Sequence, residues 1–426
     1  MEVNFSYLNW SDSNGSDYLI PHGAFWGSFN LSCDQLIFVE TEEEVGLYVY
    51  SPLETVVNTY ILPVIMVIGL LSNIAFLFVV ARVHRMRTVV NVYLVSLAFA
   101  DILFLGASMG QEIAHFASSP IAKDQGNIDF GCFVAVFLVS YVAFFTSEFL
   151  VTAVAFERFY AVCRPMQVFV GNADPWNASK LVVVSWLVAA GLAGTTVPSQ
   201  YRKHVYCFLW PTAELRAAMP PTMTTYVSLS EAASRYASFV QTFPFFVAMA
   251  VNLVLFVRVM RAMNDRLGVI GRQADGVRKN LEVRNQIARM LVINGVIFFL
   301  LMAPFQTISL YWFVKRLTGN HRYDSNKHFE GFLLFSHILT YCNSAINPII
   351  YNVANSRYRR AFLEAFSLSC GPGGCRQRLA GQGGDGARRD RRAIFATCSS
   401  MKTTNGSMRS AMKSIDRLTT EESRTL

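Results

Sequence analysis

Two acidic residues lie deep inside long apolar runs of this sequence, where an ionised side chain is costly. Asp101 belongs to the apolar run 89–110 and Glu148 to the run 130–156. Since an unpaired charge among apolar helices is strongly disfavoured, each acid is a candidate functional group. Hydroxyl and amide side chains of other runs could meet Asp101 if the runs form one bundle: Asn73, Ser147, Asn343, Ser344 and Asn347.

A carboxylate among hydroxyl and amide oxygens suits a small hard cation and its water. Asp101, Ser147 and Asn343 therefore make a candidate cation site, although a structural network that holds helices together explains the same residues equally well. Catalysis finds no support, because no Ser/His/Asp arrangement, phosphate-binding loop or cluster of metal ligands falls at an accessible place. We do not expect an enzyme.

The composition is typical of a membrane protein. Of the 426 residues, 53% are apolar and only 15% are charged, with a mean hydropathy of +0.33. A soluble enzyme or nucleic-acid-binding protein of this length is rarely so poor in charge. The net charge of +8 comes largely from basic residues in connections between apolar runs and in the tail. It therefore indicates orientation in a membrane and not a nucleic-acid partner.

Seven apolar runs are each long enough to cross a hydrocarbon core about 30 Å thick as a helix. Several contain Pro or Gly, which packed membrane helices tolerate and strands do not. The sequence therefore predicts an all-α membrane protein with a seven-transmembrane helix bundle. The cores of the predicted spans are 56–81, 89–110, 130–156, 181–198, 236–257, 290–314 and 331–354.

The distribution of charge predicts the orientation. The first 55 residues contain no Lys or Arg, whereas Arg82, Arg85 and Arg87 follow the first run with no acid among them. The positive-inside rule then places the N-terminus outside the cell and, after seven crossings, the C-terminus inside. Four sequons for N-glycosylation agree with a plasma-membrane protein in this orientation: Asn4, Asn9, Asn14 and Asn30.

Four regions follow from these patterns: an extracellular glycosylated segment at 1–55, the bundle at 56–354, a short amphipathic eighth helix at 355–366 and a disordered cytoplasmic tail at 367–426. In the eighth helix, aromatic residues recur every four positions and basic residues take the other face, which suits contact with membrane lipid.

Two kinds of modification are predicted beyond the eighth helix. Cys370 and Cys375 are candidates for palmitoylation. Hydroxyl groups of the tail, once phosphorylated, could bind an arrestin: Thr397, Ser399, Ser400, Thr403, Thr404, Ser407 and Ser410.

Five short motifs stand in order in the first, second, third, fourth and seventh runs. They are Gly69-Leu70-Leu71-Ser72-Asn73, Ser96-Leu97-Ala98-Phe99-Ala100-Asp101, Glu157-Arg158-Phe159, Trp186 and Asn347-Pro348-Ile349-Ile350-Tyr351. With them the sequence resembles the rhodopsin-like (class A) G-protein-coupled receptors over roughly 56–366. The resemblance implies a cell-surface receptor that binds an extracellular ligand and activates a heterotrimeric G protein.

The resemblance also implies roles for individual residues. Asp101, Ser147 and Asn343 correspond to a sodium pocket that favours the resting state, and no other cofactor is implied. Arg158 resembles the residue that contacts the G protein, and Glu157 restrains it at rest. A charge pair at a helix end that faces water is weak enough to exchange partners.

A hinge in the seventh helix is implied by Asn347, Pro348 and Tyr351, since a proline removes one backbone hydrogen bond. The sixth run carries Pro304 but has Met302 where the family usually has a tryptophan.

Two further positions also depart from the family. Asn252 replaces a usual tyrosine in the fifth run, and Glu148 occupies a position that is usually apolar. We expect Glu148 to be protonated at rest and hydrogen-bonded across the bundle, because a bare carboxylate there is expensive.

The resemblance implies an extracellular disulfide between Cys132, at the outer end of the third run, and Cys207, between the fourth and fifth runs. Cys33 would then be left over. The spacing from Cys132 to Arg158 is one residue longer than the family pattern, so the register at this end of the run is open.

Ser140 and Tyr341 stand where amine receptors carry an aspartate and opsins a lysine, which argues against monoamine and retinal ligands. Glu112 could receive an Arg, a Lys or an amine terminus of a ligand, or it could pair with a loop lysine or reach water. The predicted pocket collects aromatic and polar groups from the outer halves of the runs: Gln111, Glu112, Ser140, Tyr141, Phe144, Gln306, Tyr311, His337 and Tyr341.

The segment 203–235 is long enough for a β-hairpin over this pocket, with 205–210 as its first strand. With the acidic N-terminus, this favours a peptide ligand, and the pattern is similar to that of thyrotropin-releasing-hormone and neuromedin-type neuropeptide receptors. A receptor for a lipid or other small molecule stays open. So do a receptor-like protein with weak or absent G-protein coupling and a membrane transporter, although no internal repeat supports a transporter.

Overall fold

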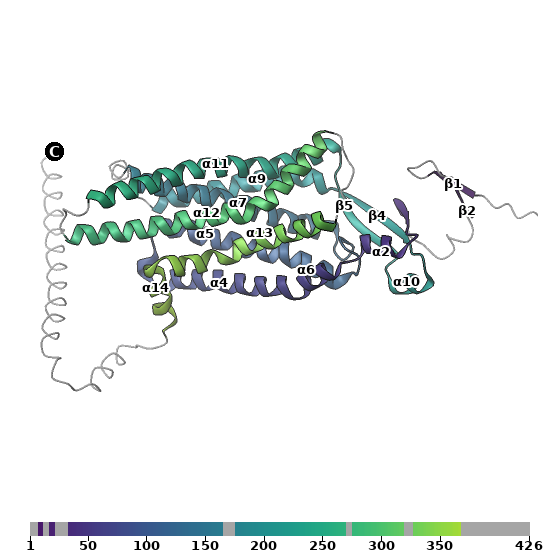
Figure 1. Cartoon of the computed structure of the whole chain (residues 1–426), viewed down its shortest axis with the longest axis horizontal. Coiled ribbons are helices and arrows are strands. Elements are labelled where there is room, and N and C mark those ends of the chain that lie inside the picture. The colour runs from purple at the N-terminus through teal and green to yellow at the C-terminus, as the bar shows by residue number, and fades with distance from the viewer. Residues whose placement is uncertain are drawn as a thin grey trace, which may run out of the picture. The chain divides into compact units, whose positions relative to one another are not determined.

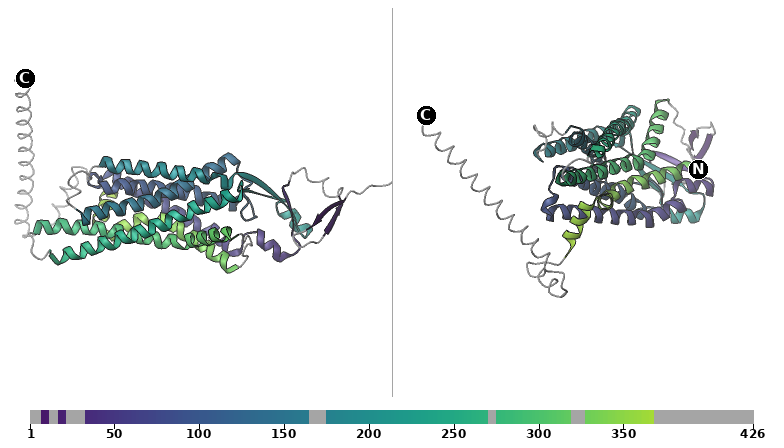
Figure 2. Two further views of the ribbon diagram at one scale, coloured as in Figure 1. Left: turned by 90° about the horizontal axis from the view of Figure 1, so that it is seen from above. Right: turned by 60° about the vertical axis from the view of Figure 1, so that its left-hand side comes forward.

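The protein is described by a computed structural model at residues 7–11, 17–21, 33–164, 175–269, 275–318 and 327–367. Long helices lie side by side in one bundle (Figure 1; Figure 2). A small β-sheet lies at one end of the bundle, and the short helix α14 (Ser356–Phe366) lies at the opposite end.

All seven predicted spans are helical. The first consists of α3 (Pro52–Val56), a π-helical turn (Val57–Ile61) and α4 (Leu62–Arg82), and the second of α5 (Val89–Phe104), a π-helical turn (Leu105–Met109) and α6 (Gly110–Ser118). The others are α7 (Phe130–Cys163), α9 (Pro175–Thr196), α11 (Glu231–Val269), α12 (Asp275–Leu317) and α13 (Lys327–Ala354).

Six of these segments are long and apolar enough to cross a membrane by composition alone, counted over the described residues. The seventh, α13, is 28 residues long but carries a stripe of polar side chains that lowers its hydropathy. Helices α11 and α12 extend beyond the predicted apolar cores, because helix formation continues through charged turns that lie outside the hydrocarbon.

The bundle buries polar groups and exposes apolar ones. On α4, Val64, Val67 and Leu71 are each more than half exposed. In contrast, Asp101 and Asn252 have no exposed surface at all. This arrangement is stable where the surroundings are lipid, since apolar side chains cost nothing there and polar groups find partners only within the protein.

Helix α4 packs closely on α13 at Gly69. A Cβ atom at this position would lie 3.0 Å from that of Ala345, so any larger residue would force the helices apart. The close approach lets Ser72 Oγ donate to the Ala345 carbonyl (3.0 Å) and Asn73 Nδ2 donate to the Ser344 carbonyl (2.9 Å). The first sequence motif therefore attaches α4 to the last span.

The fourth motif has a similar structural use. Trp186 Nε1 on α9 donates a hydrogen bond to Ser96 Oγ on α5 at 2.8 Å. This bond joins the fourth span to the second inside an otherwise apolar contact.

Three strands form a sheet at the end where α13 begins, in the order β3 (Gln35–Phe38), β4 (Arg202–Leu209), β5 (Thr222–Val227). Strands β4 and β5 pair as an antiparallel hairpin, which confirms the predicted hairpin. Helices α2 (Glu42–Tyr48) and α10 (Ala213–Ala218) lie at the same end of the bundle (Figure 1). The sequence did not predict β3, which pairs in parallel with β4 and places Leu36 opposite Cys207.

The predicted glycosylation and palmitoylation positions fall mostly outside the described residues: Asn4, Asn14, Asn30, Cys370 and Cys375. Asn9 lies on β1 (Tyr7–Ser11), which pairs with β2 (Asp17–Pro21).

The structure corrects the predicted disulfide. Cys207 is bonded to Cys33, with a Cα–Cα distance of 5.8 Å, whereas Cys132 is an exposed free cysteine in the first turn of α7. The pairing of β3 with β4 explains the difference, because Asp34 N donates to the Val205 carbonyl at 2.9 Å and so holds the preceding residue beside β4. The N-terminal segment is therefore covalently attached to the hairpin.

We expect Cys33→Ser to lower the free energy of unfolding by about 2–5 kcal/mol, because the bond closes a long loop of the unfolded chain. Thermal unfolding of the purified protein measures this loss, and Cys132→Ser should change it little. Peptide mapping without reduction should recover a Cys33–Cys207 linked peptide, and recovery of a Cys132–Cys207 peptide in its place would contradict the assignment.

Candidate functional site

A cavity of about 120 Å³ lies in the half of the bundle nearest the sheet. Five of its lining residues belong to the predicted pocket: Ser140, Tyr141, Phe144, His337 and Tyr341. The remaining lining residues were not predicted: Phe104, Ser108, Gln241, Phe305 and Thr340. Among these, Ser108, Gln241 and Thr340 are polar residues inside apolar runs, a signal that could have identified them.

Glu112 does not line the cavity itself but is hydrogen-bonded to Tyr341, which does. Tyr341 Oη donates to Glu112 Oε2 at 2.7 Å, and Ser108 Oγ lies 3.3 Å from the same Tyr341 oxygen. The π-helical turn that precedes α6 includes Ser108, so Ser108 and Glu112 both face α13. The predicted acid is therefore joined to the cavity by a hydrogen bond.

Other acids gather on this side of the bundle. Burial, together with the smaller effects of the carboxylates of Glu112, Glu54 and Asp124, raises the pKa of Tyr50, which lies just before α3, to about 12. This rim of the cavity is therefore negative.

The facing rim, between α11 and α12, is positive. The Arg316 guanidinium donates to the Ser234 carbonyl at 3.2 Å and to Ser238 Oγ. Tyr141 of the cavity wall lies close enough to interact electrostatically with Arg316, and its hydroxyl donates to Gln241 Oε1 at 3.2 Å. Charges of opposite sign thus lie next to two different tyrosines of the cavity wall, Glu112 beside Tyr341 and Arg316 near Tyr141.

Three predicted pocket residues lie elsewhere. Gln111 is bonded to His115 at 3.0 Å, and Gln306 is fully buried outside the cavity lining. Tyr311 is 41% exposed and packs against neighbouring aromatic rings.

Of the predicted cation ligands, the structure holds Asp101 in the bundle interior. Asn347 Nδ2 donates to Asp101 Oδ2 at 2.8 Å, and the second carboxylate oxygen has no hydrogen-bond partner. Ser147 and Asn343 lie together on the wall of a second, smaller cavity, and Asn343 Oδ1 also has no partner. These free oxygens fit a small hard cation.

Glu148 lines this second cavity with Met302 and Phe298. It is 1% exposed, and neither carboxylate oxygen has a hydrogen-bond partner. The expected hydrogen bond across the bundle is therefore wrong. Asn252, the other departure in this region, donates to Thr152 Oγ1 on α7 at 2.8 Å and so links the third and fifth spans.

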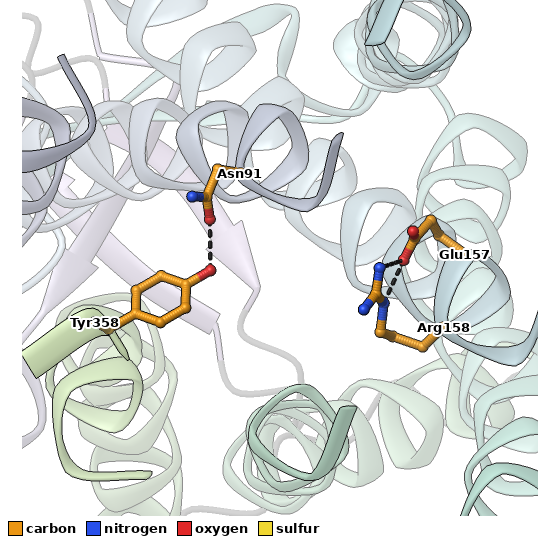
Figure 3. Close-up of polar contacts among 4 residues, drawn as sticks. All are labelled: Asn91, Glu157, Arg158 and Tyr358. Carbon is orange, nitrogen blue, oxygen red and sulfur yellow. Dashed lines mark hydrogen bonds and ion pairs between the residues drawn. The ribbon is translucent and has the colours of Figure 1, made fainter. Parts of the chain in front are cut away.

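At the opposite end of α7, Arg158 forms an ion pair and a hydrogen bond with Glu157 (Figure 3). The two side chains are 12% and 22% exposed, so the pair lies at the edge of the protein interior. The two residues of the predicted pair are therefore in direct contact.

Nearby, the Tyr358 hydroxyl of α14 donates to Asn91 Oδ1 of α5 (Figure 3). Asn91 in turn donates to the Met86 carbonyl, so its whole amide is used. Both side chains are at least 97% buried. This polar contact attaches the eighth helix to the bundle, and the sequence analysis did not identify it.

The predicted hinge residues lie beside this contact. The ring of Tyr351 lies 5.9 Å from that of Tyr358 and 5.4 Å from that of Phe76, yet the buried Tyr351 hydroxyl has no partner. Pro304 and Pro348 lie inside α12 and α13 as expected.

Seven helices with a cavity at one end and a partly exposed arginine–glutamate pair at the other define a seven-helix membrane receptor. Residues 72–351 match the family described as 7 transmembrane receptor (rhodopsin family). The chain belongs to this family, which confirms the resemblance to rhodopsin-like G-protein-coupled receptors.

Several characterised receptors are similar to the chain over most of its length. A thyrotropin-releasing hormone receptor of Gallus gallus is 29% identical over 69% of this chain and 74% of its own. Neuromedin-U receptor 1 of Homo sapiens is 28% identical over 80% and 79%, and somatostatin receptor type 4 of Rattus norvegicus is 28% identical over 71% of each chain.

The hydrogen bond from Tyr358 predicts that Tyr358→Phe and Tyr351→Phe differ in their effect on the free energy of unfolding. Tyr358→Phe should lower the free energy of unfolding by about 1–3 kcal/mol, because it leaves the buried Asn91 oxygen without a donor. Tyr351→Phe is the matched control and should be nearly neutral, since its hydroxyl makes no hydrogen bond. Thermal unfolding of the purified protein checks both, and equal losses would contradict the assigned bond.

Proposed function

We propose that this protein is a plasma-membrane receptor that binds an extracellular peptide and activates a heterotrimeric G protein. The observation that carries the proposal is on α7, which contributes Ser140, Tyr141 and Phe144 to the cavity wall and Arg158 to the other end. From Phe144 to Arg158 the helix rises about 21 Å. One rigid element therefore joins a ligand cavity to an ion pair near the far surface.

The orientation follows from charge. The cavity opens toward the end that carries the N-terminal segment, which lacks Lys and Arg, and Arg158 lies at the end where Arg82, Arg85 and Arg87 follow the first span. By the positive-inside rule the cavity faces the outside of the cell and Arg158 faces the cytoplasm.

A peptide ligand is supported by the relatives and by the cavity. The similar receptors are named for thyrotropin-releasing hormone, neuromedin U and somatostatin, which are peptides. The cavity holds one side chain or one terminal residue, so the rest of a peptide would lie along the charged mouth. A basic group near Glu112 would gain a charge-assisted hydrogen bond.

Activation requires the Arg158 pair to open. When the outer helix ends close on a ligand, rearrangement at Met302 and Pro304 and at the Asn347–Pro348 hinge would repack the inner ends of α12 and α13. Arg158 would then leave Glu157 and contact the G protein. This change of partner needs little free energy, because an ion pair at a partly exposed site is weak. Na⁺ held by Asp101, Ser147 and Asn343 would favour the resting arrangement.

A small-molecule or lipid ligand is the second candidate. The modest volume of the cavity and its aromatic walls, which include Phe104, Phe144 and Phe305, would also suit a compact apolar compound. Such a ligand would make no use of the opposed charges at the mouth. Arrestin binding by a phosphorylated tail and lipid contact by α14 complete the proposal.

Cells that express the full chain and are screened with a peptide library should respond with a change in calcium or cyclic AMP. Arg158→Ala should abolish this response with surface expression retained, because the G-protein contact is lost. A lipid library screened in parallel distinguishes the second candidate. A solute flux that survives Arg158→Ala would favour a transporter and contradict the proposal.

Glu112→Gln should lower the potency of an active basic peptide by about 10- to 100-fold, which is the usual size of a hydrogen bond to a charged group. Concentration–response curves measure the shift. Glu330→Gln is the matched control. Glu330 is an exposed acid in the first turn of α13 and does not line the cavity. If the peptide were equally potent on the Glu112 variant and on the control, its basic group would not bind at Glu112.

A further inference from the structure

Arg316 lies in the last turn of α12, where its side chain is partly buried and bonded to α11. Both bonds come from one nitrogen, since Nη1 donates to the Ser234 carbonyl at 3.2 Å and to Ser238 Oγ. Nε and Nη2 have no hydrogen-bond partner among the described residues. Because Nε–H and one N–H of Nη2 point in the same direction, one complete edge of the guanidinium is available for a bidentate partner.

The charge of Arg316 is not balanced within the part of the chain that the structure describes. No carboxylate there forms an ion pair with it, and the group that interacts with its charge is the Tyr141 side chain. A partly buried guanidinium gains most from an anion that accepts two parallel hydrogen bonds, and a carboxylate has this geometry. The available edge of Arg316 is therefore suited to a carboxylate from outside the bundle.

The Arg316 guanidinium lies about one helical turn from the ligand cavity. Tyr141 and Gln241 line the cavity and are hydrogen-bonded to each other at 3.2 Å. On α11, Ser238 accepts from Arg316 and precedes Gln241 by three residues, which is a rise of about 4.5 Å. A side chain in the cavity and a carboxylate at Arg316 can therefore belong to one residue of a ligand.

We propose that Arg316 binds the C-terminal carboxylate of a peptide whose last side chain fills the cavity. The proposal rests on the proposed peptide-receptor function and names the end of the peptide that the cavity holds. The volume of about 120 Å³ suits one apolar side chain, since an apolar cavity of about 150 Å³ is known to hold benzene.

The terminal carboxylate fits this site better than an acidic side chain does. An α-carboxylate is attached to the same Cα atom as the apolar side chain, so both can be bound at once. The carboxylate of an Asp or Glu side chain would instead leave the aromatic cavity without an apolar group, or place a charge inside it. A peptide with a C-terminal amide would lose the charge that Arg316 recognises.

The test measures thermal unfolding of the purified full chain in detergent with two small probes, N-acetyl-leucine and N-acetyl-leucine amide. The probes share one side chain and differ in the carboxylate, and ionic strength is held equal. At about 20 mM the acid should raise the unfolding temperature by about 1–3 °C, because it binds the folded state. The amide should raise it little.

Three variants assign the difference to Arg316. Arg316→Gln should weaken the apparent affinity for the acid by about 10- to 100-fold, so that acid and amide behave alike. Arg316→Lys keeps the charge without the planar edge and should keep part of the difference. Lys315→Gln is the matched control, because the Lys315 ammonium lies over the rings of Tyr311 and Trp312 at 5.5 and 5.2 Å, and the full difference should remain.

Equal stabilisation by the two probes, or no stabilisation by the acid, would overturn the proposal. So would an undiminished effect of the acid on Arg316→Gln. The measurement uses no G protein and no signal, so these results would leave the proposed receptor function standing. That function fails separately, if no peptide activates cells that express the chain.

Discussion

Lipid offers no hydrogen-bond partners, so the polar groups of α13 must be satisfied within the bundle. Asn347 donates to Asp101 on α5, and the carbonyls of Ser344 and Ala345 accept from Asn73 and Ser72 on α4. One of these bonds joins α13 to the second span, and the other two join it to the first span. Because the alternative is an unpaired polar group in hydrocarbon, the polar stripe fixes the rotation of α13 and holds the first, second and seventh spans together.

This constraint also sets where the receptor can change shape. Several oxygens in this part of the bundle have no hydrogen-bond partner: Asp101 Oδ1, Asn343 Oδ1, both Glu148 oxygens and the Tyr351 hydroxyl. These polar groups could form hydrogen bonds in another arrangement of the helices. The polar interior therefore favours its present packing less strongly than the surrounding apolar contacts do.

The spans could be predicted from the sequence because hydropathy depends on composition and needs no knowledge of tertiary contacts. The cavity could be predicted only in part. Counting from motifs places Gln306 in the pocket, but counting does not give the rotation of a helix, and the structure buries this side chain elsewhere. Ser108 was missed because a π-helical turn shifts the face that the second span presents after Phe104.

The disulfide could not be predicted at all from spacing. Its two cysteines are 174 residues apart, and they meet only because β3 adds to the hairpin in parallel. Sequence patterns predicted the antiparallel hairpin, whose strands are close in the chain. They gave no indication that β3, which lies far away in the sequence, pairs with β4. Long-range register is set by packing at the end of the bundle that carries the sheet, where Val45 and Ile121 meet Phe208 and Trp210.

The attachment of the N-terminal segment to β4 has a consequence for proteolysis. A protease that cut the backbone between Phe38 and Pro52 would sever the segment from the first span, but the bond from Cys33 to Cys207 would keep it on the receptor. Release of the segment would need reduction as well as cleavage, so a nicked receptor would keep its N-terminal segment and still migrate as one species until thiol was added.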